Sequence, residues 1–97
     1  MLSYIVLASF TEQGIRSVKD TTKRANAAKD MAGRFGVNMR ETYWTQGQYD
    51  LVTICEAEDE AAISAFGLAL AAAGNVRFQT MRAFSAPEMD RILSKLP

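Results

Sequence analysis

The sequence predicts one α+β domain of the ferredoxin-like type, spanning residues 1–97, with a four-stranded antiparallel sheet. Apolar residues recur with a period of two in some segments and at helical spacing in others. These segments follow the order strand, helix, strand, strand, helix, strand, which is the split βαβ pattern of this fold. A chain of 97 residues also leaves no room for a second domain.

Two segments are apolar on both of their faces, Leu2–Phe10 and Tyr49–Ala57. A strand with two apolar faces is covered on both sides, so we expect both segments to form central strands. Val37–Gln46 carries polar groups on both faces and is predicted to be an edge strand. Plain alternation along it places Arg40 and Trp44 on one face. The fourth strand is predicted over Val76–Phe84.

The first helical region starts at Thr11 and Glu12 and breaks near Val18–Asp20. A second start at Asp20–Thr22 opens a longer helix that ends at Gly36, a typical C-terminal cap. One face of this helix consists mainly of small side chains, which would let the helix lie close to the sheet; its members are Ala25, Ala28, Ala32 and Phe35.

The second long helix begins at Glu58–Glu60, where acidic residues suit a helix N-terminus, and ends at Gly74. A capping box over Ser85–Glu88 then predicts a short last helix. That helix has one apolar face, formed by Met89, Ile92, Leu93 and Leu96.

The composition argues against several classes of function. Eleven basic and eleven acidic residues give a net charge of zero, so no electrostatic attraction to nucleic acid or an anionic membrane is expected. Histidine is absent and Cys55 is the only cysteine, which argues against histidine-based catalysis, zinc and iron–sulfur sites. We expect no metal, no cofactor and an inert, buried Cys55 thiol.

The N-terminal segment Met1–Phe10 lacks the basic start of a secretion signal, and no stretch is long and apolar enough to span a membrane. We therefore expect a cytoplasmic protein.

The second apolar face of the two central strands predicts self-association. In the ferredoxin-like fold both long helices cover one face of the sheet, and the last helix is too short to shield the other. A second copy of the sheet would cover it and form a dimeric α/β barrel, burying about 600–1,000 Å² per partner. The alternative is that the last helix and the edge side chains suffice.

Three motifs resemble the GYD domain family. Tyr4–Leu7 with Phe10–Ile15 resembles its opening, and Gly47, Tyr49 and Asp50 match its glycine, tyrosine and aspartate. Its last strand is matched by Gly74–Arg77, Thr80 and Arg82–Phe84. The resemblance covers about residues 3 to 93. It implies the fold of the dimeric α+β barrel group, which includes ligand-sensing domains and small cofactor-free enzymes, and it implies no particular reaction.

Polar and aromatic side chains around the predicted hairpin form the candidate ligand site. Asp50 follows a tight turn and either caps it or serves as an acceptor or general base. The aromatic residues nearby suit either a packing contact or a ligand platform. An arginine facing a covered sheet needs an acidic partner or a bound anion. The candidate residues are Tyr4, Arg40, Trp44, Tyr49, Asp50, Arg77 and Arg82.

Three functions remain open, and each predicts a different interior. The first is an oligomeric module that binds a small organic acid or aromatic metabolite, or acts as an accessory protein. In that case we expect a polar pocket with an arginine between helix and sheet. If the chain is a cofactor-free enzyme that acts on an aromatic or lactone substrate, Asp50 or a tyrosine should face a cavity without an ion-pair partner, and the pKa of that side chain should be raised. A purely structural oligomer that binds other proteins predicts no cavity. We favour the first, and whether the chain is an enzyme stays open.

Overall fold

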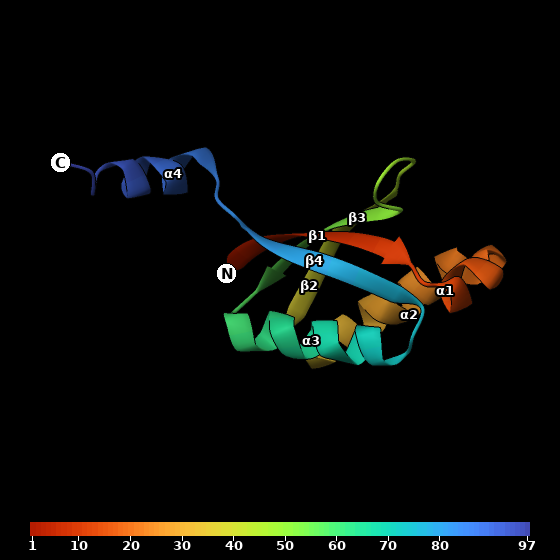
Figure 1. The fold of residues 1–97 in the computed structure, drawn as a ribbon. Coiled ribbons are helices and arrows are strands. Elements are labelled where there is room, and N and C mark those ends of the chain that lie inside the picture. Colours follow the sequence, from red (N-terminus) through yellow and green to blue (C-terminus); the bar gives the residue numbers. More distant parts are fainter.

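A computed structural model describes residues 1–97 as a four-stranded antiparallel sheet with two long helices on one face (Figure 1). The strand order is β2-β3-β1-β4, which confirms the ferredoxin-like fold and the central positions of β1 and β3. In chain order the elements are β1 (Leu2–Phe10), α1 (Glu12–Arg16), a 3₁₀ turn (Val18–Asp20), α2 (Thr21–Arg34), β2 (Val37–Trp44), β3 (Leu51–Ala57), α3 (Glu60–Ala72), β4 (Val76–Ala83) and α4 (Ala86–Leu93).

A β-bulge in β2 changes which side chains share a face. Met39 pairs with Cys55, and the next pair is Glu41 with Ile54, so Arg40 is an extra residue in β2. The residues after the bulge therefore move to the opposite face from the one that plain alternation gives. The prediction that Arg40 and Trp44 share a face is wrong for this reason: Trp44 bonds to α2 on the helix side, whereas Arg40 pairs with Glu56 of the opposite face.

The helices begin near the predicted capping residues, but the Asp20 side chain makes no capping hydrogen bond at the start of α2. The Thr11 and Asp59 side chains accept backbone N–H groups in the first turns of α1 and α3, and Ser85 and Glu88 form the predicted capping box of α4. Gly36 and Gly74 follow α2 and α3 with φ of 74° and 86°, a left-handed conformation that glycine adopts without strain.

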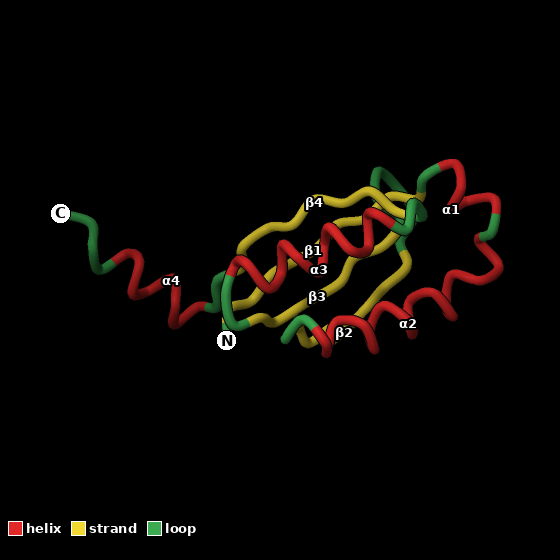
Figure 2. Tube along the Cα trace, turned by 90° about the horizontal axis from the view of Figure 1, so that it is seen from below, coloured by secondary structure: helices red, strands yellow, loops and turns green.

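The hydrophobic core occupies only one end of the space between sheet and helices. It consists of Tyr4, Ala32, Val37, Met39, Cys55, Ala57, Ile63 and Phe66. Figure 2 shows α2 and α3 close together above this end and diverging toward the end of β1. The expected close approach of α2 to the sheet holds at Ala32, which is fully buried, but Ala25 and Ala28 lie where the helices diverge and border an open space.

The other face of the sheet has no helix over it (Figure 1). Ile5, Leu7, Val52 and Ile54 lie at its centre and are only half-buried, and Met81 on β4 is exposed. We call this surface the open face. Helix α4 does not cover it, because α4 projects beyond the end of the sheet.

The projecting α4 makes the molecule elongated. Its radius of gyration is 14.6 Å, against about 12.5 Å for a compact chain of this length. No helix combines the length and apolar character needed to cross a membrane.

Candidate functional site

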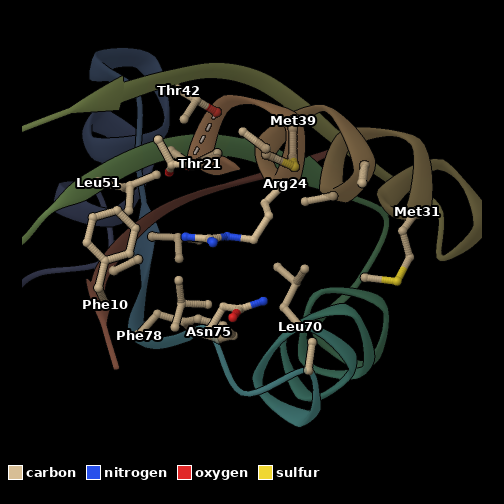
Figure 3. A pocket seen from close by; sticks show the side chains of 18 residues that line it. Phe10, Thr21, Arg24, Met31, Met39, Thr42, Leu51, Leu70, Asn75 and Phe78 are labelled. Atoms are coloured by element: carbon tan, nitrogen blue, oxygen red, sulfur yellow. Dashed lines mark hydrogen bonds between the residues drawn. The ribbon is translucent and has the colours of Figure 1, made fainter. Parts of the chain in front are cut away.

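A cavity of about 290 Å³ lies between α2, α3 and the helix-facing side of the sheet (Figure 3). It occupies the end where the two helices diverge. Its walls are mostly apolar, and small alanine side chains of α2 leave the space unfilled. The larger apolar side chains that line it are Val6, Phe10, Met31, Met39, Leu51, Leu70, Val76 and Phe78.

Arg24 is the only charged residue that lines the cavity. It comes from the first turn of α2 and extends across the cavity in Figure 3. Its Nη1 donates to the backbone oxygen and the Oγ of Ser17, at 2.8 and 2.7 Å, and its Nη2 donates to the Gly14 carbonyl at 3.1 Å. The guanidinium carbon lies 5.9 Å from the centroid of the Phe10 ring. Arg24 is thus held by uncharged acceptors and makes no ion pair.

A few neutral polar groups accompany Arg24 around the cavity. Asn75 lies opposite it, and the Asn75 Oδ1 accepts a hydrogen bond of 3.0 Å from the Gln13 amide. The hydroxyl oxygens of Thr42 and Thr53 lie 3.4 Å apart on the strands. The lining contains no carboxylate, lysine, cysteine or tyrosine, so it suits reversible binding of a ligand better than proton transfer or nucleophilic attack.

The predicted residues Tyr49 and Asp50 lie together in the loop between β2 and β3. The Asp50 Oδ2 accepts the backbone N–H of Phe10 at 2.8 Å, and the Asp50 N–H donates to the Ala8 carbonyl at 2.8 Å. The Tyr49 hydroxyl donates to the Gln79 side chain at 3.0 Å across the open face. Both residues therefore tie the loop to neighbouring strands, and neither lines the cavity.

Tyr4 and Arg82 also lie together, but at the other end of the sheet from the cavity. The Arg82 guanidinium lies close to two rings, with its carbon 5.6 Å from the Tyr4 centroid and 4.6 Å from that of Phe84. It donates to the Ser3 carbonyl at 3.1 Å and lies 3.7 Å from the Glu88 carboxylate. The Tyr4 hydroxyl is buried and has no hydrogen-bond partner.

The remaining predicted residues are dispersed. Arg40 pairs weakly with Glu56 at 3.8 Å. Arg77 is exposed and makes no ion pair, and the Trp44 indole N–H donates to the Thr21 hydroxyl at 3.0 Å. The seven predicted residues thus form two pairs and three separate positions, and none of them lines the cavity.

Sequence reasoning missed Arg24, although the sequence contains a signal for it. Arg24, Ala28 and Met31 follow helical spacing, so Arg24 belongs to the inner face of α2. An arginine in a row of small apolar residues on a buried helix face is a better candidate than an arginine on a strand edge.

Two groups outside the cavity, Cys55 and Tyr43, have a raised pKa. Cys55 is buried as predicted, and burial raises the pKa of its thiol to about 11, which disfavours the reactive thiolate. The Tyr43 hydroxyl donates to the Glu41 carboxylate on the protein surface, and this bond raises the pKa of Tyr43.

The fold and the cavity define a small α+β domain with one half-buried arginine between its two long helices and its sheet. The chain belongs to the GYD domain family, whose model matches residues 4–93.

A curated relative from Thermus thermophilus is 31% identical over 90 residues, which cover 92% of this chain and 95% of the relative. It is named glutamine synthetase and cystathionine beta-lyase binding protein. The crystal structure of TTHA0845, also from Thermus thermophilus, is similar in fold, with a TM-score of 0.58 and 22% identity over 89% of this chain and 96% of that one.

Proposed function

We propose that this protein is a non-catalytic accessory protein of the cytoplasm that acts as a homodimer or larger assembly and binds metabolic enzymes. The relative named for binding glutamine synthetase and cystathionine beta-lyase supports the protein-binding role. The zero net charge is compatible with association between copies.

The open face is the observation that carries the self-association. The chain has 6589 Å² of accessible surface, whereas a compact monomer of its mass exposes about 5,500 Å². The excess of about 1,100 Å² exceeds the roughly 800 Å² that each partner buries in a standard protein interface. The projecting α4 contributes to this excess together with the open face, so a second copy that covers Ile5, Leu7, Val52 and Ile54 and also contacts α4 would remove much of it.

Helix α4 supports a second copy as the partner. Its apolar side chains Met89, Ile92 and Leu93 are exposed, and α4 is displaced toward the side of the open face (Figure 1). It lies beyond the end of its own sheet, so it does not cover its own open face. In a pair of facing sheets, α4 of each copy can pack against the other copy, which buries two apolar surfaces at once.

Native mass spectrometry and size-exclusion chromatography with light scattering test this assembly. We expect a dimer or larger species for the wild type, and monomers for Ile54→Glu, because a carboxylate would be buried at the centre of the interface. Leu68→Glu is the matched control: Leu68 is 73% exposed on α3, away from the open face, and its variant should assemble like the wild type. A monomeric wild type at micromolar concentration refutes the proposed assembly.

Binding of enzymes is tested separately by biolayer interferometry, with glutamine synthetase and cystathionine beta-lyase purified from the organism that produces this protein. Saturable binding of either enzyme to the immobilised wild type is the expected result. Serum albumin is the negative control. Absence of binding to both enzymes contradicts the proposed choice of partners and leaves the result on self-association unaffected.

A further inference from the structure

We propose that the cavity between α2, α3 and the sheet is a binding site for a small monocarboxylic acid with an apolar body, and that Arg24 binds the carboxylate. This site is separate from the open face, so the inference does not depend on the assembly proposed above.

The charge of the site selects an anion. Arg24 is half-buried and is the only charged residue in the lining. The acceptors of its three hydrogen bonds are two backbone carbonyls and a hydroxyl, so no carboxylate neutralises it. Removing a guanidinium from water without a counter-charge is costly, and a bound carboxylate offsets that cost through charge-assisted hydrogen bonds.

The guanidinium is held in place before any ligand arrives. Bonds to Ser17 and Gly14 fix its two terminal nitrogens, and the Phe10 ring lies beside it at 5.9 Å. A guanidinium has five N–H donors, so three hydrogen bonds leave donors free for a carboxylate. A group that is already ordered loses little conformational entropy when the ligand binds.

The walls set the chemical class of the rest of the ligand. Val6, Met39, Leu70 and Phe78 present apolar surface, which favours an apolar body and disfavours a polyhydroxylated one. One cation matches one carboxylate, so phosphates and dicarboxylates would leave charge unpaired. The cavity of about 290 Å³ is at the small end of ligand sites, which run from about 300 to 1,000 Å³. It suits one aromatic ring or a short alkyl chain.

The test uses 3-phenylpropanoate as the probe and 3-phenylpropanamide as its uncharged counterpart. Both are titrated into the full-length protein while the methyl signals of Met31 and Met39 are followed by ¹³C NMR. We expect saturable shifts of both signals with the acid and at least about tenfold weaker binding of the amide, because the amide cannot form the charge-assisted hydrogen bonds of a carboxylate. Absence of saturable shifts, or equal affinity for acid and amide, refutes the proposal.

Variants on α2 separate recognition from folding. Arg24→Met should abolish the preference for the acid over the amide, whereas Arg34→Met, an exposed change on the same helix, should keep it. Ala25→Leu, which adds a larger side chain to the cavity wall and keeps Arg24, should weaken the binding of both compounds about tenfold or more. If Arg24→Met does not fold, the Ala25→Leu result decides: unchanged binding there means that the probe binds elsewhere and refutes the site.

Discussion

The Asp50 carboxylate accepts the backbone N–H of Phe10 at 2.8 Å and so extends the pairing of β1 with β3 beyond the last main-chain pair, Ala8 with Leu51. The backbone of Asp50 contributes twice more, since its N–H donates to Ala8 and its carbonyl accepts the N–H of Thr45 at 2.8 Å. Gly47 lets the loop turn back, with a φ of 144°. The aspartate of the family motif therefore fastens the β2–β3 loop to the centre of the sheet.

Asp50→Ala should destabilise the fold by about 1–3 kcal/mol, because it leaves the half-buried N–H of Phe10 without an acceptor. Asp50→Asn keeps an oxygen at that position and should cost less, about 1 kcal/mol. Urea unfolding followed by Trp44 fluorescence measures both. A stability of the alanine variant within about 0.5 kcal/mol of the wild type would contradict the fastening role.

The strand order could be predicted from the sequence, because two segments that are apolar on both faces can only be central in this topology. The sequence was not sufficient to predict the faces of β2. The bulge at Arg40 leaves no mark on local alternation, since it is fixed by pairing with β3. The divergence of α2 and α3 is equally non-local, so the alanine row of α2 could not distinguish close packing from a cavity wall.

Gly14→Ala should destabilise the protein by about 3 kcal/mol. A methyl group at Gly14 would lie 2.0 Å from the Asn75 carbonyl oxygen. The same oxygen accepts the N–H of Thr11 at 3.1 Å. The added methyl would therefore force α1 away from the start of β4. Gly33→Ala is the matched control in α2, where no atom lies within 4 Å of the added methyl. It should stabilise by about 0.5–1 kcal/mol. Thermal and urea unfolding measure the stability of both variants. Equal changes in stability for Gly14→Ala and Gly33→Ala would contradict the close approach of Gly14 to Asn75.

Tyr4→Phe should leave the protein as stable as the wild type or stabilise it by about 1 kcal/mol, because the buried hydroxyl of Tyr4 has no partner and its removal ends a desolvation cost. The ring that lies against Arg82 is retained. Tyr4→Leu is the control that removes this ring and should destabilise. A loss of more than about 1 kcal/mol in Tyr4→Phe would show that the hydroxyl makes a stabilising bond.

Titration of the Cys55 thiol should lower the free energy of unfolding at alkaline pH. Burial raises its pKa in the folded state from 9.0 to about 11. The unfolded chain therefore releases this proton first, so the stabilisation is complete below pH 9 and is lost as the pH rises from 9 toward 11. The drop in unfolding free energy between pH 8 and pH 10 should be smaller in Cys55→Ala than in the wild type. Identical drops would mean that the thiol titrates normally.

Glu88 should make helix α4 sensitive to acid. Its carboxylate accepts the Ser85 N–H at 2.9 Å, and this bond, with a smaller contribution from Arg82, lowers the pKa of Glu88 below its ordinary value of 4.5. A lowered pKa in the folded state means that the stabilisation is present above pH 4.5 and is lost as the pH falls through the folded value. The Cα chemical shifts of Ala86–Leu93 should therefore lose helical character below pH 4.5.

Glu88→Gln is the control for this acid transition, because glutamine keeps an oxygen acceptor for the capping box at every pH. Its α4 shifts should be nearly independent of pH between 7 and 3, and slightly less helical than the wild type at pH 7, since the charge near the helix N-terminus and the contact with Arg82 are lost. A wild-type α4 whose helical shifts persist unchanged to pH 3 would mean that packing against a partner surface, and not the cap, holds this helix.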